Sequence, residues 1–106
     1  MEESKMEKWA DYGISAVRYD QNDQYIDKVK VHPDNGDSIG QSETWSRKDV
    51  VSKIDDGKTF TTILKGSDGK WKKGQDVHVI TVDGERFLRT DANKRKSDNL
   101  ENLPTF

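Results

Sequence analysis

The last residues of the chain place apolar side chains at regular intervals up to the final position. Leu100, Leu103 and Phe106 recur every third residue, after a polar stretch that follows a charged, strand-like segment. A terminal segment with evenly spaced apolar residues is expected to dock on a hydrophobic core, because a frayed end has nothing to bury. The tail therefore predicts a domain whose C-terminal segment packs on the core.

The chain is short and polar. It has 106 residues, of which 30% are hydrophobic and 36% are charged, and this length suits one domain with a small core. The hydrophobic residues occur in short runs between turn residues, which indicates a folded domain and not general disorder. We expect a single α+β domain over residues 13–106, preceded by a flexible, charged lead over residues 1–12.

The charge and the cysteine content exclude several classes of protein. The net charge of -2 gives no overall attraction to nucleic acid or to an anionic membrane. The absence of cysteine excludes disulfides and thiolate metal sites. No apolar stretch is long enough to span a membrane, and the N-terminus lacks the apolar core of a signal peptide. We therefore expect a cytoplasmic protein with no membrane partner.

The charge is unevenly divided along the chain. Residues 1–56 carry 13 acidic and 8 basic side chains, whereas residues 57–106 carry 7 acidic and 10 basic ones. This asymmetry is compatible with one basic surface, although fluctuation in a charge-rich chain explains it as simply.

Alternation of apolar and polar residues predicts five strands. In the second of them, Val29 and Val31 point to one face, and Lys28 and Lys30 point to the other. This pattern is typical of a half-buried strand, and we expect it to pair antiparallel with the first. The predicted strands are Gly13 to Asp20, Ile26 to His32, Lys58 to Lys65, Asp76 to Val82 and Glu85 to Thr90.

A single short helix is predicted after the second strand. Ser46 is suited to cap its start, and Asp49 can complete a capping box. Trp45 before the cap can pack on Val50 as a hydrophobic staple, and Gly57 supplies the stop. The helix spans about three turns and must gain its stability from packing on the sheet.

These elements define the expected fold class. The order ββαβββ fits an α+β domain with a five-stranded, mostly antiparallel curved sheet or half-open barrel covered by one helix. Asp83-Gly84 predicts a tight hairpin between the last two strands. The segment from Gly66 to Gly74 is expected to be a loop.

With these elements placed, the chain resembles a bacterial family known as domain of unknown function 3892. The resemblance covers roughly residues 13–106. It supports a single-domain identity, but it implies no activity and no catalytic residues. The matching stretches are Ile14-Ser15-Ala16-Val17-Arg18, Ser46-Arg47-Lys48-Asp49-Val50-Val51, Gly57-Lys58-Thr59-Phe60, Leu88-Arg89-Thr90-Asp91, Asp98-Asn99-Leu100 and Leu103-Pro104.

No catalytic, metal or cofactor site emerges from the motifs. Gly57-Lys58-Thr59 follows the predicted helix, whereas a phosphate-binding loop must precede one. His32 and His78 lack partners at metal-ligand spacing, so they are interpreted as ordinary strand histidines. Asp91 and Asp98 could form an acid–base pair, but capping of turns explains them more simply.

Two groups of residues remain as candidates for ligand binding. The segment containing Lys70, Trp71, Lys72 and Lys73 combines cations with an aromatic ring, as nucleic-acid binders do. A solvated loop whose tryptophan packs back on the core predicts the same residues. Lys94-Arg95-Lys96 could extend such a surface.

Arg18 and Arg89 form the second group. Each lies in a predicted strand beside apolar residues, where a guanidinium could bind a ligand anion. The alternative is a structural salt bridge, for instance between Arg89 and Asp98.

We therefore expect a non-enzymatic binding or accessory module, without a cofactor, for an unknown protein or small ligand. A weak, sequence-tolerant nucleic-acid binder using the Lys70–Lys73 loop is the alternative, and a small enzyme acting through Arg18 and Arg89 is the third hypothesis. A protein-binding module would need an exposed apolar patch or an unpaired sheet edge, for which the first or second strand is the candidate.

Overall fold

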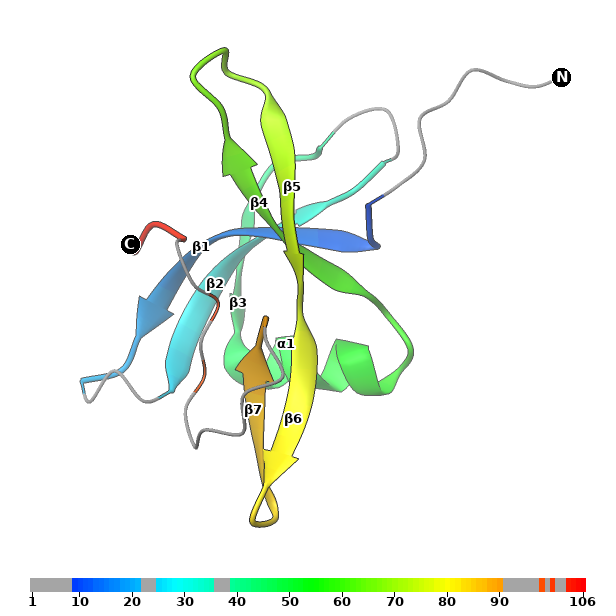
Figure 1. Ribbon diagram of the computed structural model, residues 1–106, viewed down its shortest axis with the longest axis vertical. Coiled ribbons are helices and arrows are strands. Elements are labelled where there is room, and N and C mark those ends of the chain that lie inside the picture. The colour runs from blue at the N-terminus through cyan, green and yellow to red at the C-terminus, as the bar shows by residue number, and fades with distance from the viewer. Residues whose placement is uncertain (1–8, 22–24, 36–38, 91–97, 99, 101–102) are drawn as a thin grey trace, which may run out of the picture.

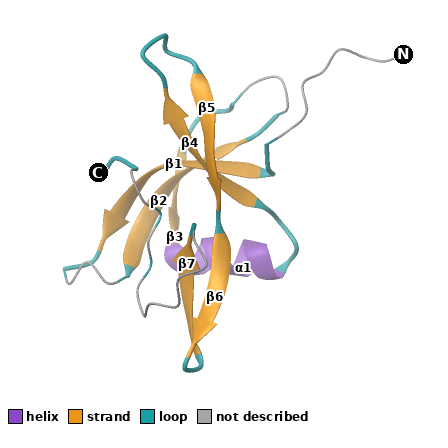
Figure 2. Cartoon of the chain, in the orientation of Figure 1, coloured by secondary structure: helices purple, strands orange, loops and turns teal. Residues whose placement is uncertain are grey.

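The computed structural model describes residues 9–21, 25–35, 39–90, 98, 100 and 103–106. Seven strands and one helix follow one another along this part of the chain (Figures 1 and 2). They are β1 (Tyr12–Tyr19), β2 (Ile26–Pro33), β3 (Glu43–Ser46), α1 (Arg47–Asp55), β4 (Phe60–Lys65), β5 (Trp71–Asp76), β6 (His78–Val82) and β7 (Glu85–Arg89).

The strands form a five-stranded sheet and a separate hairpin. The large sheet has the order β3-β2-β1-β4-β5, in which only β1 and β4 run parallel. Strands β6 and β7 pair with each other. The predicted α+β class, with one helix and a mostly antiparallel five-stranded sheet, is confirmed. The sheet is mixed and does not close into a barrel, and the order of its strands differs from the predicted one.

Two strands were not expected. β3 has four residues, and Trp45 is its only large apolar side chain, so it carries little alternation. β5 takes up the second part of the predicted Gly66–Gly74 loop, from Trp71 onward. Its lysines suggested a solvated loop, but lysine is common on edge strands because its charge discourages pairing with other chains.

The long strand expected between Asp76 and Val82 is interrupted where the chain leaves the large sheet. Here Gly74 lies against Thr62 so closely that a Cβ would come within 2.1 Å of the Thr62 Oγ1 atom. The pairing of β4 with β5 is irregular at this point, between Thr61 and Ile63. Glycine permits this close approach, and β6 then continues into the second sheet.

The expected hairpin between the last two strands is present. Asp83 and Gly84 form its turn with positive φ angles of 52° and 80°, and Val82 pairs with Glu85 on either side. Two successive positive φ angles match the twist of the flanking strands, which explains the strong preference for glycine here.

The predicted caps of the helix are also confirmed. The Ser46 hydroxyl accepts a hydrogen bond from the Asp49 N–H, and the Asp49 carboxylate accepts one from the Ser46 N–H. At the other end, Gly57 has a φ of 92°. The N–H groups of Gly57 and Lys58 donate to the carbonyls of Ile54 and Lys53, which is the Schellman arrangement.

One face of the large sheet builds the core. Val29 and Val31 are fully buried there, as their alternation predicted. Helix α1 contributes Val50 and the β6–β7 hairpin contributes Leu88 to the same cluster. The helix and the hairpin therefore cover the same face of the sheet.

The C-terminal segment packs on the core through Leu100 and Leu103, as expected, whereas Phe106 lies outside the core cluster and contacts Arg18 and Lys30. Leu100 is 1% exposed and Leu103 is partly buried against the core cluster. The N–H of Val17 donates to the Pro104 carbonyl, and the N–H of Phe106 donates to the Val17 carbonyl. The tail thus pairs with β1 beyond the Tyr12–Ile14 stretch that pairs with β4, and the end of the chain lies beside β1 in Figure 1.

The carboxylate of Asp98 joins the two sheets. It is buried and accepts hydrogen bonds from the backbone N–H of Ile26 (2.7 Å) and from that of Leu88 (2.7 Å). The guanidinium of Arg47, the first residue of α1, donates to it at 2.6 and 3.2 Å. Since β3 ends opposite Lys28, the N–H of Ile26 lies beyond β3, and Asp98 provides its acceptor.

We predict that Asp98→Asn destabilises the domain by about 3 kcal/mol, because it leaves the Arg47 charge unpaired and turns an amide N–H towards backbone donors. Chemical denaturation followed by tryptophan fluorescence measures the change. Asp27→Asn, on the exposed surface of β2, is the matched control and should change stability by about 0.5 kcal/mol or less. Equal losses in the two variants would contradict the role of Asp98.

Candidate functional site

The face of the large sheet that points away from the core is rich in cations. On β2, Lys28, Lys30 and His32 alternate with the buried Val29 and Val31. Side chains on successive strand residues point to opposite faces. The three polar residues therefore share the face that α1 and the hairpin leave uncovered.

The pairing of β1 with its neighbours extends this face. Arg18 lies opposite Lys28, and Gly13 lies opposite His32. Gly13 in turn lies opposite Thr61 of β4. Residues opposite each other in a sheet point to the same side, so Arg18 joins the lysines of β2.

Strands β4 and β5 add two more lysines. Counting by alternation from Thr61, Ile63 and Lys65 point to this side. Lys65 lies opposite Trp71, and Ile63 lies opposite Lys73. We call the resulting surface the open face; it consists of Arg18, Lys28, Lys30, His32, Lys65, Trp71 and Lys73.

The open face is positively charged although the chain is acidic. It carries five cations, whereas its described carboxylate is Asp76, which lies opposite Thr61. The Asp76 carboxylate is 3.3 Å from the Lys73 ammonium group. The weak hint of a basic surface in the sequence therefore has a structural counterpart, but it does not follow the division into halves.

An aromatic ring lies between two of the cations. The ring centroid of Phe106 is 4.8 Å from the Arg18 guanidinium carbon and 4.9 Å from the Lys30 ammonium nitrogen. The Arg18 Nε atom also donates to a backbone oxygen of Phe106 at 2.9 Å. Contacts of this kind hold cations in place, so the docked tail organises this end of the open face.

His32 organises the other end. Its Nδ1 atom donates to the Gly40 carbonyl at 2.9 Å, so its Nε2 atom accepts from the Ser15 hydroxyl at 2.7 Å. The Trp71 ring packs edge-on against the imidazole with 5.0 Å between centroids, and the Lys65 ammonium lies 5.1 Å from the Trp71 centroid. His32 is thus a satisfied strand histidine, as interpreted from the sequence, and Trp71 packs back on the sheet.

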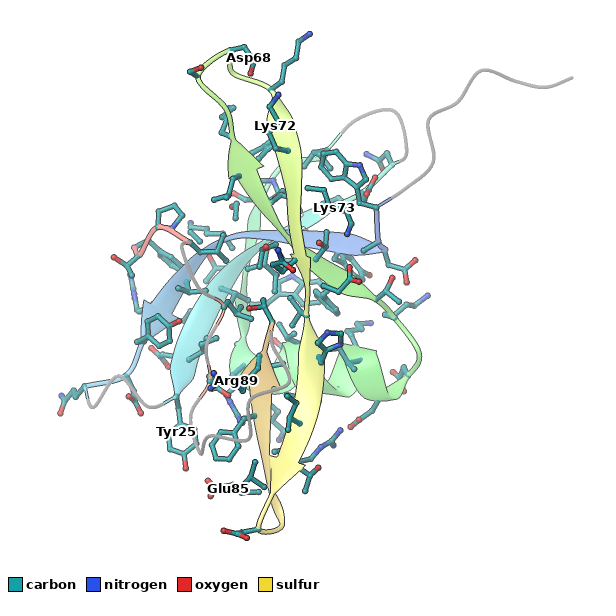
Figure 3. All side chains as sticks on the ribbon, viewed as in Figure 1. Tyr25, Asp68, Lys72, Lys73, Glu85 and Arg89 are labelled. Atoms are coloured by element: carbon teal, nitrogen blue, oxygen red, sulfur yellow. The ribbon has the colours of Figure 1, made fainter. Side chains whose placement is uncertain are left out.

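The predicted lysine segment lies on the arm formed by β4 and β5, which projects at the top of Figure 1. Lys70 is exposed in its turn, and Lys72 is 3.8 Å from Asp68. Figure 3 shows Asp68 and Lys72 toward the tip of the arm and Lys73 near its base. Lys72 lies opposite Leu64, so it points away from the open face. The structure therefore brings Trp71 and Lys73, but not the whole segment, together with Arg18.

The two predicted arginines have different environments. Arg18 is exposed on the open face, whereas Arg89 at the end of β7 is 2% exposed and is already engaged by other groups. Figure 3 places Arg89 on β7, within the body of the protein. Neither guanidinium lines the two grooves described below.

The prediction that the first or second strand forms an edge of the sheet was wrong. β1 and β2 lie inside the large sheet, and its edges are β3 and β5. Sequence reasoning could not find them, because β3 and β5 are the two strands that it missed. Among the described residues, Leu64 is the exposed large hydrophobic residue, at 39%, so this part of the chain offers little apolar surface to a protein partner.

A groove of about 610 Å³ between α1 and the β6–β7 hairpin contains several charges, and most of them are engaged in contacts. Arg86 donates two hydrogen bonds to Asp55, at 2.8 and 2.5 Å. Glu85 accepts a hydrogen bond from the Tyr25 hydroxyl. The groove is therefore interpreted as a structural network between the helix and the hairpin.

This network shifts the pKa values of Tyr25, Asp55 and Arg86. The hydrogen bond to Glu85 raises the pKa of the Tyr25 hydroxyl above its usual value. The hydrogen bonds from Arg86 lower the pKa of Asp55. Each shift favours the protonation state that maintains the contact.

We predict that Tyr25 ionises at a higher pH than free tyrosine, whose pKa is about 10. Because the folded-state pKa is raised, the stabilising contribution is complete below the unfolded value and is lost as the pH rises through the folded value. Ultraviolet difference absorbance of the phenolate measures this in the protein and in Glu85→Gln, with Tyr25→Phe identifying the signal. Glu85→Gln should lower the midpoint, and an unchanged midpoint would show that the contact is not made.

The described part of the chain contains no group of three or more residues able to hold a metal ion. Its single helix is too short and too polar to cross a membrane. Asp91 and Lys94-Arg95-Lys96 lie outside the described residues, so turn capping by Asp91, the alternative acid–base pair with Asp98 and the extended basic surface are not tested.

The model of one protein family, described as a protein of unknown function (DUF3892), matches residues 13–104. The chain belongs to this family. The match spans nearly all of the predicted domain and includes the residues from β1 to Pro104, but the family description names no activity. No curated protein and no solved structure matches the chain.

Sequence reasoning found Arg18, Trp71 and Lys73 but not the surface that unites them. Lys28 and Lys30 were recognised only as the polar side of a strand. Their alternation with valine was the available signal, because it already placed two cations on one face. The contribution of Phe106 could not be found, since it depends on where the tail docks.

Proposed function

We infer that the protein is a non-enzymatic binding module, and that the open face binds the phosphate backbone of single-stranded nucleic acid with little sequence preference. The observation that carries this inference is the cluster of Arg18, Lys28 and Lys30 around the Phe106 ring. Arg18 and Lys28 lie directly opposite each other, and Arg18 and Lys30 contact the same ring.

Without a ligand, such a cluster lowers the stability of the sheet. Like charges opposite each other on neighbouring strands destabilise a sheet. Phosphate groups would relieve this repulsion, and binding would release the counterions that surround the nucleic acid. A cationic cluster on an acidic chain is therefore better explained by an anionic ligand than by the stability of the fold.

The rings favour contacts to phosphate over recognition of bases. Trp71 is packed between His32 and Lys65, and Phe106 contacts two cations. Rings engaged in this way are less available for stacking on bases, which supplies much of the affinity of other single-strand binders. Binding through cations alone is weak and tolerant of sequence.

The alternative, a module that binds a protein or a small ligand, is less well supported on this surface because its described residues present little apolar area. The cytoplasmic location and the bacterial source remain predictions, as does the absence of a cofactor. This proposal modifies the expected Lys70–Lys73 site. Trp71 and Lys73 remain part of it, whereas Lys28 and Lys30 take the place of Lys70 and Lys72.

The test is a titration of a fluorescently labelled single-stranded oligonucleotide, followed by anisotropy at several salt concentrations. If about three phosphates are neutralised, the logarithm of the binding constant should fall with the logarithm of the salt concentration with a slope of about -2. The double variant Lys28→Gln, Lys30→Gln should weaken binding about tenfold at low salt and reduce the slope by about one unit.

The double variant Lys48→Gln, Lys53→Gln is the matched control. It removes the same charge from exposed positions on α1, on the side of the sheet that faces the core. It should retain nearly the binding and the salt slope of the unmodified protein. Equal effects of the two double variants would leave only nonspecific attraction, and undetectable binding at low salt would reject the proposal.

A further inference from the structure

A second groove adjoins the open face at Asp76 but contains none of its cations, and the inference drawn from it does not depend on the proposed function. It has a volume of about 510 Å³ and lies where the end of α1, the start of β4 and the β5–β6 junction approach one another (Figure 1). We call it the Lys58 groove. Its walls include Trp9, Ile54, Lys58, Val77, His78 and Val79.

The walls of the groove are mostly apolar. Val77 is 7% exposed, and Ile54 and Val79 are packed against the core cluster. The backbone N–H of Trp9 donates to the Asp34 carboxylate at 2.9 Å, which holds the indole-bearing residue at this place. The volume lies within the range of small-molecule sites, and Trp9, Ile54, Val77 and Val79 form the apolar part of the walls.

Of the polar side chains in the groove walls, Thr59 and Asp76 are engaged with other residues, whereas Lys58 and His78 are exposed. The Thr59 hydroxyl donates to Asp11 and accepts from its N–H. Asp76 pairs with Lys73 at 3.3 Å. Lys58 is exposed, and no described carboxylate lies within ion-pair distance of its ammonium group. The charge that the groove offers to a ligand is therefore positive.

We propose that the Lys58 groove binds a small aromatic carboxylate. The ring lies along Val77 and Val79 beside the indole of Trp9, and the carboxylate pairs with the Lys58 ammonium group. The aromatic character of the ligand follows from the tryptophan in the wall, because offset or edge contacts between rings add to the burial of apolar area. The anionic group follows from Lys58.

The test uses indoleacetate and its neutral analogue indoleacetamide on the full chain, labelled for amide chemical-shift mapping. A ligand with roughly a dozen non-hydrogen atoms and ordinary efficiency should bind with a Kd of about 1 mM. Shifts are expected at Trp9, Lys58 and Val77–Val79. Indoleacetamide should bind about three- to fivefold more weakly, as expected for the loss of an exposed ion pair.

The variant Lys58→Gln distinguishes binding through the ion pair from nonspecific hydrophobic binding. It should abolish the difference in affinity between indoleacetate and indoleacetamide, because it removes the partner of the carboxylate. The control Lys53→Gln, on the exposed surface of α1, should retain that difference. Trp9→Ala should weaken both ligands to a similar extent.

Three results would overturn the proposal. The first is the absence of shifts at these amides at concentrations about tenfold above the expected Kd. The second is equal binding of the acid and the amide, and the third is unchanged affinity in Trp9→Ala. Because an oligonucleotide on the open face would shift Arg18, Lys28 and Lys30 instead, failure here and failure of the nucleic-acid proposal give different spectra.

Discussion

The structure depends on one buried carboxylate that four donors share. Asp98 accepts hydrogen bonds from the backbone of β2, from the backbone of β7 and twice from the guanidinium of Arg47. A buried charge is tolerated only when it is paired and its lone pairs are satisfied, and here the partners come from both sheets and the helix. Moving any one of these elements would break a charge-assisted hydrogen bond to a buried carboxylate. The carboxylate thereby couples the position of the hairpin and the helix to that of the large sheet.

This arrangement leaves the two faces of the large sheet with different roles. The helix, the hairpin and the tail bury one face around Val29, Val31, Val50 and Leu88. The other face is left to its cations, and Gly13 makes room there for the Ile63 side chain, which a Cβ would approach to 2.8 Å. Because successive strand residues point to opposite faces, burying the valines of β2 places its lysines together on the other face. The result is a cationic surface on an acidic chain. The Lys58 groove lies at the margin of the buried face, where the elements that cover it do not meet.

Local signals in the sequence were reliable where the interaction is local. The capping residues Ser46 and Asp49, the stop at Gly57 and the turn at Asp83-Gly84 all act within a few residues, and the structure confirms each of them. The missed strands β3 and β5 are different, because their own residues favour them only weakly. They are edge strands that form because β2 and β4 offer them partners. The same reasoning explains the open face, of which the sequence indicated Arg18, Trp71 and Lys73 but not their common side.

By itself, the sequence determined the class of the fold, the place and limits of the helix, the last hairpin and the docking of the tail. Each of these features follows from hydrophobic periodicity, from a capping residue or from a turn residue. Such local signals act without contacts to distant parts of the chain. Only the tertiary structure decided that Arg47 pairs with Asp98, that Phe106 lies between Arg18 and Lys30, and which strands lie at the edges. Those contacts join residues far apart in the chain, and composition and spacing do not specify which distant segments meet.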